Sequence, residues 1–147
     1  MTELEDGNIL ARTIWGEARG EGEAGMTAVA AVIRNRACIA ARYMGVRGRP
    51  HPLFGDGTIA SACTAPRQFS CWNASDPNRA KLLAVTAIDP QFHDATRIAE
   101  ETIGGARADP TNGADHYFEK SIPVPDWARG KTPTATIGHH VFFKLEA

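Results

Sequence analysis

The residue with the clearest chemical potential is Glu17. It follows Leu10 by seven positions and Ile14 by three, so at about 100° per residue it falls within the apolar stripe of a helix. A carboxyl group in apolar surroundings is harder to ionise, so it can donate a proton to a leaving oxygen near neutral pH, as glycosidic bond cleavage requires. Spacing alone does not decide between this role and a structural one, in which Glu17 pairs at a helix end with Arg19 or Arg34.

Other catalytic chemistries have little support in the sequence. The five histidines include no HExxH motif and no Cys-plus-His ligand set, so we expect neither a metal site nor a cofactor. No G-x-S-x-G elbow is present, and Cys38 lies in the middle of a predicted helix, where a thiol is not activated. Cys38, Cys63 and Cys71 are therefore expected to be small buried hydrophobes, while a Cys63–Cys71 bridge stays open as an alternative.

Aromatic residues on predicted loops and strand edges favour a carbohydrate ligand. Sugar rings present apolar faces that stack on aromatic side chains, while their hydroxyl and acetamido groups form hydrogen bonds. The aromatic candidates are Phe69, Trp72, Tyr117, Phe118 and Trp127, and the polar candidates are Gln68, Ser70, Asn73, Tyr117 and His139. The alternative is that most of these aromatic side chains fill the core between helices and sheet.

Helices are predicted from apolar spacing, N-cap residues and glycine stops. The predicted helices are residues 7–19, 26–41, 58–65, 78–88 and 90–103. Asp6 or Asn8 is expected to cap the first helix, and Gly45 to end the second. Asp76 and Asp89, each followed by proline, are expected to cap the last two. The many alanines of the second helix indicate close packing against its neighbours.

The remaining segments predict a loop, a strand-like rim and a small sheet. Residues 45–57 are rich in glycine, proline and charge, which is typical of a loop, whereas residues 68–72 look extended. Three segments alternate at period two around a turn at Gly138–His139, and they read DHYFEK, PTATI and HHVFFKL. We therefore predict an α+β fold, a helical body with a small antiparallel sheet, in one domain over residues 1–147.

Composition excludes some classes of partner. The chain has 147 residues, 43% of them hydrophobic, and a formal charge of −1, so its overall field gives no reason to expect nucleic acid. No apolar run reaches the roughly 18 residues of a membrane span, so no integral membrane segment is expected. The first ten residues, MTELEDGNIL, are acidic where a signal peptide would be basic and then apolar.

Five blocks of the sequence together resemble a known family. In chain order they read IWGEARGEGEAGMTAVAAVIRNR, RQFSCW, GADHYF, PDWAR and TATIGHHVFF. Their order and spacing are similar to those of the spore-cortex-lytic or cell-wall hydrolase family, of the SleB and CwlJ type. The resemblance covers almost the whole chain, and the GEARGE block followed by AVAAVIRNR is its most specific part.

The resemblance implies a lysozyme-like fold and cleavage of peptidoglycan between N-acetylmuramic acid and N-acetylglucosamine. The catalytic glutamate of the family, the first in GEARGE, corresponds to Glu17. Substrate-binding positions are implied at Gln68, Phe69, Ser70, His116 and Tyr117, and Trp127 is added as an aromatic residue on a loop. Since neither Glu21 nor Asp115 is a clear second carboxylate, we favour a lytic transglycosylase that forms 1,6-anhydromuramic ends. The alternatives are a hydrolytic muramidase and a non-catalytic wall-binding or phage structural module.

The sequence also suggests where such a protein acts. Without a visible leader or wall-binding repeat, we expect a phage or prophage endolysin, made in the cytoplasm and acting on the cell wall or periplasmic peptidoglycan after release. A holin-like protein is the expected route of access, and a monomer the expected state. Peptidoglycan glycan strands are the expected partner.

Overall fold

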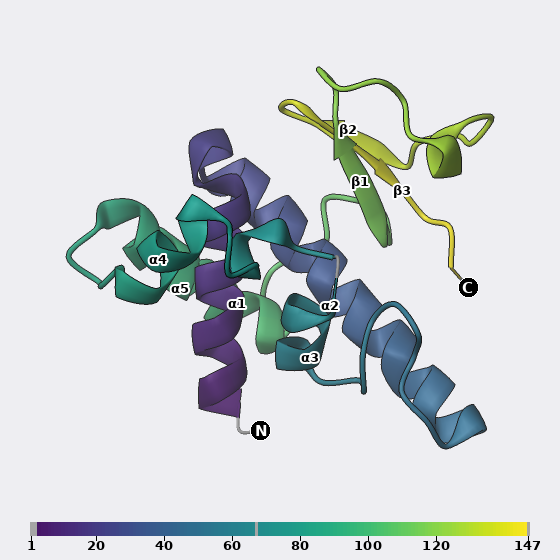
Figure 1. The fold of residues 1–147 in the computed structure, drawn as a ribbon, viewed down its shortest axis with the longest axis horizontal. Helices are drawn as coiled ribbons and strands as arrows, with labels where there is room; N and C mark the ends of the chain where they lie inside the picture. The colour runs from purple at the N-terminus through teal and green to yellow at the C-terminus, as the bar shows by residue number, and fades with distance from the viewer. Residues whose placement is uncertain (1–2, 67, 147) are drawn as a thin grey trace.

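The computed structural model describes residues 3–66 and 68–146, and it has a helical body with a small sheet on one side (Figure 1). The predicted domain limits, residues 1 and 147, lie outside this part of the chain. The α-helices are α1 (Glu3–Ala18), α2 (Gly22–Arg47), α3 (Ile59–Thr64), α4 (Pro77–Ala84) and α5 (Pro90–Ile103). Short 3-10 helices are η1 (Arg19–Glu21), η2 (Ser70–Trp72) and η3 (Asp126–Ala128). Within the described residues, no helix combines the length and apolar character needed to cross a bilayer.

Helix α2 is the central element of the fold. Every residue from 25 to 33 is buried, because α1, α3 and α5 pack on one side of the helix while the sheet covers the other (Figure 1). Val29 and Ile33 belong to the helical core, whereas Ala28 and Val32 contact the sheet. The alanine-rich sequence of α2 therefore serves close packing on both sides.

Some of the predicted helix caps and ends are confirmed, and others are wrong. Asp76 and Asp89 cap α4 and α5 as predicted, each accepting a hydrogen bond from a backbone N–H in the first turn. Helix α1 spans Glu3–Ala18, so the predicted caps Asp6 and Asn8 lie inside it. Gly45 does not end α2, which continues to Arg47.

The true end of α2 is set by backbone conformation. Gly48 adopts the left-handed region, with φ 70°, and its N–H bonds the carbonyl of Met44. Gly45 lies within the helix and meets nothing that would stop it. A glycine inside a helix costs only about 1 kcal/mol, too little to end one whose other residues favour it.

The sheet forms from the three segments with period-two alternation. Strands β1 (His116–Glu119), β2 (Ala135–Ile137) and β3 (His140–Phe143) are antiparallel, in the order β1-β3-β2 (Figure 1). The predicted turn at Gly138–His139 joins β2 to β3, and Gly138 has φ 56°. The predicted α+β architecture is confirmed.

The strand-like rim predicted at residues 68–72 is wrong. Phe69 alone keeps an extended backbone, and the next three residues form η2. The alternation arises because Phe69 and Cys71 both point into the helical core while Ser70 is exposed. The Nε1 of Trp72 donates to Oγ1 of Thr13 at 3.0 Å, which fixes η2 against α1.

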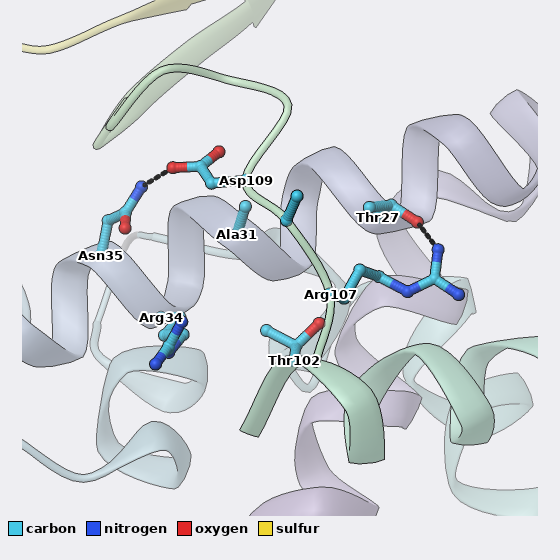
Figure 2. Close-up of a pocket in the computed structure, with 8 residues that line it drawn as sticks. Thr27, Ala31, Arg34, Asn35, Thr102, Arg107 and Asp109 are labelled. Carbon is cyan, nitrogen blue, oxygen red and sulfur yellow. Dashed lines mark hydrogen bonds between the residues drawn. The ribbon is translucent and has the colours of Figure 1, made fainter. Parts of the chain in front are cut away.

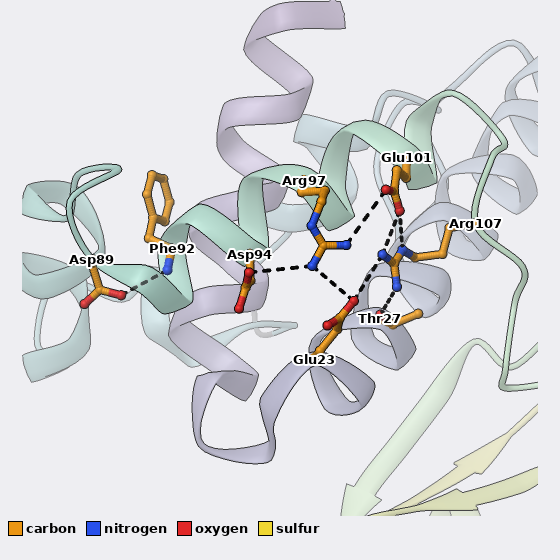
Figure 3. Close-up of polar contacts among 8 residues, drawn as sticks. All are labelled: Glu23, Thr27, Asp89, Phe92, Asp94, Arg97, Glu101 and Arg107. Atoms are coloured by element: carbon orange, nitrogen blue, oxygen red, sulfur yellow. Dashed lines mark hydrogen bonds and ion pairs between the residues drawn. The ribbon is translucent and has the colours of Figure 1, made fainter.

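Polar contacts strap the loop after α5 onto α2. Figure 2 shows Nδ2 of Asn35 bonded to Oδ2 of Asp109 at 2.9 Å, and Nη1 of Arg107 bonded to Oγ1 of Thr27 at 2.9 Å. In Figure 3 the guanidinium of Arg107 also joins a surface network of charged side chains from α2 and α5, which are Glu23, Asp94, Arg97 and Glu101. These contacts hold the chain against α2 just before it enters β1.

The first prediction concerns the cap of α5. Asp89 accepts from the N–H of Phe92 at 3.0 Å (Figure 3) and from Nε1 of Trp15 at 3.4 Å, so it also ties α5 to α1. Asp89→Ala should lower the free energy of unfolding by about 1 to 2 kcal/mol, measured by urea denaturation. Asp126→Ala, at an exposed aspartate that pairs with nearby Arg129, is the control and should change it by less than about 0.5 kcal/mol. Equal effects of the two substitutions would contradict the role of Asp89.

Candidate active site

Glu17 lies in the last turn of α1, as its spacing predicts. It is partly buried, and its neighbours Ile14 and Ala18 are fully buried in the helical core. Gly16 allows this helix end to approach the rest of the site, since a Cβ there would lie 3.3 Å from Sγ of Cys71 and 3.1 Å from Leu82. A side chain at position 16 would push η2 away from Glu17.

The carboxyl group of Glu17 faces Cys71. Burial raises the pKa of Glu17, while hydrogen bonds from the thiol and backbone N–H of Cys71 oppose the rise. The charge of Asp76 raises this pKa further and that of Arg36 lowers it. The net effect is a pKa above the usual range of a glutamate, which suits a proton donor.

The structural role considered for Glu17 does not match its surroundings. Arg19 instead stacks on the ring of Trp15, with 4.1 Å from Cζ to the ring centroid, and donates to Oδ1 of Asn78. Arg34 is exposed on α2. Glu17 is therefore a partly buried acid with several titratable or charged neighbours, and we call this group, formed by Glu17, Arg36, Cys71, Asp76 and Tyr117, the Glu17 site.

The three predicted substrate-binding residues on the segment after α3 differ in exposure. Phe69 is only 4% exposed, and its ring packs in the helical core, so little of its face is open to a ligand. Gln68 is partly exposed and Ser70 is exposed. Their neighbour Cys71, which the sequence did not indicate as part of a site, makes the direct contact with Glu17.

Strand β1 sends its predicted site residues to opposite faces of the sheet. Tyr117 contacts both hydrophobic cores, and burial raises the pKa of its hydroxyl, with a further rise from the charge of Glu17. His116 lies on the other face, where its ring centroid is 5.0 Å from that of Trp127. The structure thus brings Tyr117 to Glu17, and it places His116 and Trp127 in a separate aromatic cluster with Phe118 and Phe143.

The two acids considered as second carboxylates are both engaged elsewhere. Asp115 is fully buried and accepts hydrogen bonds from Nδ1 of His116 and from the N–H groups of Leu145 and Glu146. Burial alone would raise the pKa of Asp115, but these bonds hold it below its ordinary value. Glu21 bonds Nδ1 of His139 at 2.9 Å, which ties the β2–β3 turn to η1.

A charged residue on an apolar helical stripe, the signal that identifies Glu17, also occurs at Arg36. Arg36 follows Val29 by seven positions and Ile33 by three, so a charge lies on the apolar stripe of α2. It is 5% exposed. The sequence predicted Asp76 only as the N-cap of a helix and not as a neighbour of Glu17. No sequence pattern linked Cys71 to Glu17.

The prediction that all three cysteines are buried is wrong for one of them. Cys63 and Cys71 are buried as expected, but Cys38 is exposed on α2. All three thiols are free, so the alternative Cys63–Cys71 bridge is not formed.

Comparison with known proteins gives consistent matches. The sequence profile of the family described as Cell Wall Hydrolase matches residues 20–143, starting just after Glu17. The spore cortex-lytic enzymes of Oceanobacillus iheyensis and Bacillus subtilis are 31% and 30% identical to the chain over 140 and 138 residues. These alignments cover 95% and 93% of this chain but only 41% and 37% of those proteins, so the chain spans about two fifths of their length.

Two solved structures are similar to the fold. The catalytic domain of the Bacillus cereus SleB protein has a TM-score of 0.66 and 27% identity, covering 95% of this chain and 89% of that one. The catalytic domain of the germination-specific lytic transglycosylase SleB from Bacillus anthracis has a TM-score of 0.60 and 26% identity, covering 95% and 93%. The predicted lysozyme-like architecture is confirmed by this similarity.

The raised pKa of Glu17 predicts that the stability of the fold depends on pH. The unfolded chain releases this proton at lower pH than the folded one. Protonated Glu17 therefore stabilises the fold at acid pH relative to higher pH, and this stabilisation is lost as the pH rises through the folded pKa. Glu17→Gln should therefore have a Tm about 1 to 4 °C above that of the unsubstituted protein at pH 8, with the gap closing below about pH 4. Glu100→Gln, at an exposed glutamate of α5, should show no such pH-dependent gap in calorimetry. A gap that stays constant with pH would count against a buried, protonated Glu17.

Proposed function

This chain belongs to the cell wall hydrolase family, and from that premise we propose that it cleaves peptidoglycan glycan strands between N-acetylmuramic acid and N-acetylglucosamine. The relatives named above are spore cortex-lytic enzymes, and one similar structure is named a lytic transglycosylase. The single observation that carries the proposal is the carboxyl group of Glu17, partly buried at the end of α1 against Cys71, whose pKa burial raises above the usual range.

The reaction needs one group that first gives and then takes a proton. Protonated Glu17 donates to the glycosidic oxygen while the bond from that oxygen to C1 of muramic acid breaks and positive charge develops at C1. The C6 hydroxyl of the same sugar then attacks C1, and its proton passes to the Glu17 carboxylate. The product is 1,6-anhydromuramic acid, no water is consumed, and Glu17 returns to its starting state.

The hydrogen bonds that Asp115, Glu21 and Asp76 already make favour this internal attack over hydrolysis. A hydrolytic mechanism needs a second carboxylate about 5 to 9.5 Å from the first, to activate water or stabilise the sugar. Asp115 accepts two backbone N–H groups and His116 while fully buried, and Glu21 is bonded to His139. Asp76, which lies within electrostatic range of Glu17, already caps α4 through the N–H of Asn78.

Product chemistry separates the two outcomes. We expect mass spectrometry of digested, purified peptidoglycan to give muropeptides one water lighter than hydrolysis products and resistant to borohydride reduction. Reducible muramic ends would reject the transglycosylase in favour of a hydrolytic muramidase. Chelator in the digest should leave the rate unchanged, because the proposed chemistry uses only the carboxyl group of Glu17 and a hydroxyl group of the substrate.

A turbidity assay tests whether the chain is an enzyme at all. Purified protein should clear permeabilised cells, and Glu17→Gln should lower the rate about a thousandfold, because it keeps the shape but removes the acid. Glu100→Gln is the matched control and should clear at the normal rate. A non-catalytic wall-binding or phage structural module would sediment with the wall and never clear it.

The endolysin role stays a prediction within this proposal. It assigns the chain to a phage or prophage, places its synthesis in the cytoplasm, and makes access to the wall depend on a holin-like protein. The turbidity assay extends to this role. Purified protein, expected to sediment as a monomer, should clear permeabilised cells. Cells that express the chain without a permeabilising protein should stay intact and turbid. Lysis by expression of the chain alone would contradict this route.

A further inference from the structure

The C-terminal end of α2 projects beyond the helices that pack around it. Figure 1 shows the helix running past α3, with the chain that follows it returning at its side. Every residue from 41 to 50 is exposed except Tyr43, which is partly buried. We call residues 41–53 the α2 tip. Because most helical stability in proteins comes from packing, contacts with the core do not explain why α2 extends this far.

The α2 tip is strongly basic. It carries Arg42, Arg47 and Arg49, and no aspartate or glutamate occurs from residue 24 to residue 55, although the whole chain has a formal charge of −1. Among the described residues, none of these three arginines forms an ion pair. The next acid along the chain, Asp56, accepts hydrogen bonds within its own loop. The positive charge of the tip is therefore not balanced by carboxylates in contact with it.

Tyr43 gathers two of these arginines at the end of the helix. The Cζ atom of Arg47 lies 5.7 Å from the centroid of the Tyr43 ring, and Nη2 of Arg49 donates to the Tyr43 hydroxyl at 3.5 Å. The ring of His51 meets the same ring edge-on, with 5.0 Å between the centroids. Contacts of this kind orient a guanidinium without neutralising it. Both cations are thus held close to one aromatic ring and keep their charge.

A pocket next to the tip adds a fourth cation. Arg42 and Lys144, which directly follows β3, both line a pocket of about 210 Å³ between α2 and the chain around the sheet. Glu146 lines it as well, but among the described residues neither cation forms an ion pair with this glutamate. Since a water molecule takes about 30 Å³, the pocket has room for a phosphate group between the two cations.

Exposed apolar side chains accompany these cations. Val46 is 82% exposed, Leu53 41% and Met44 38%. A single exposed apolar residue is ordinary on a protein surface, but the α2 tip groups three of them. A soluble anionic polymer offers phosphates to the arginines and nothing to Val46. The headgroup region of a lipid bilayer takes both kinds of side chain, so the composition of the tip favours a bilayer as its partner.

We propose that the α2 tip is a docking surface for an anionic lipid bilayer. Arg47 and Arg49 contact lipid phosphates, the pocket between Arg42 and Lys144 receives another, and Val46 with its apolar neighbours enters the headgroup region. The contact is end-on, because the helix end projects from the body of the fold (Figure 1). The proposal goes beyond the cleavage of peptidoglycan and does not depend on it, since no residue of the tip belongs to the Glu17 site.

Sedimentation with vesicles tests the proposal. The probes are vesicles of phosphatidylcholine alone and of an equal mixture with phosphatidylglycerol. Purified protein should sediment with the anionic vesicles and stay in solution with the neutral ones, and added salt should weaken the binding. Arg47→Gln combined with Arg49→Gln should weaken it about thirtyfold, because each arginine near an anionic surface contributes about fivefold. Val46→Ser, which removes apolar contact alone, should weaken it about fivefold.

Matched controls come from α4 and the loop after it. Arg79→Gln combined with Lys81→Gln removes two exposed cations, and Ile88→Ser removes an apolar side chain that is 92% exposed. These variants should bind anionic vesicles as the unsubstituted protein does. All the substituted side chains are exposed, so every variant should keep its Tm within about 2 °C.

Three results would overturn the docking surface. The first is sedimentation with neither kind of vesicle or equally with both, and the second is an equal loss of binding in the tip and control variants. The third is tight binding of soluble polyphosphate together with an unchanged Val46→Ser, which would assign the tip to an anionic polymer instead. The tip variants should cleave purified peptidoglycan at the normal rate, so failure of the docking surface and failure of the proposed function are distinguishable.

Discussion

The constraint on which the rest of the structure depends is that α2 must be buried on every side. Over residues 25–33 the helix has almost no solvent-facing surface, so its side chains are small or apolar apart from Thr27, and the helical core and the sheet are both built against it. Arg36 is the first charged residue past this run that stays buried, and its bond to the Asp115 carbonyl joins the two halves of the fold.

The Glu17 site is a consequence of this arrangement. Helix α1 packs on one side of α2 and ends where η2 closes over it, and Gly16 lets the two backbones approach. The carboxyl group of Glu17 is thus desolvated by core packing that the fold requires anyway. Its proton affinity is then a balance between burial, the thiol and backbone N–H of Cys71, and two charges of opposite sign, Asp76 and Arg36. None of these groups is close in sequence to Glu17, so the balance exists only in the folded chain.

Local sequence signals predicted the elements well and the contacts between them poorly. Helix α5 was predicted with the limits that it has, because Asp89-Pro90 starts it with two independent signals. The alternation in residues 68–72 was misread, because burial of Phe69 and Cys71 at alternate positions is produced equally by a strand and by a 3-10 turn. Glu17 was identifiable because its anomaly is local. Cys71 was not, because its contact with Glu17 comes from tertiary packing alone.

Burial sets the reactivity of the two core thiols, Cys63 and Cys71. Burial raises the pKa of Cys63 to about 12 and raises that of Cys71 as well, so neither is present as the thiolate that reacts with oxidants or disulfides. Cys38, the exposed thiol, lies on the outer face of α2 rather than in the Glu17 site. Oxidation at Cys38 therefore leaves the acid and its neighbours untouched. The thiol that bonds Glu17 is therefore shielded from oxidants by the same packing that places it there.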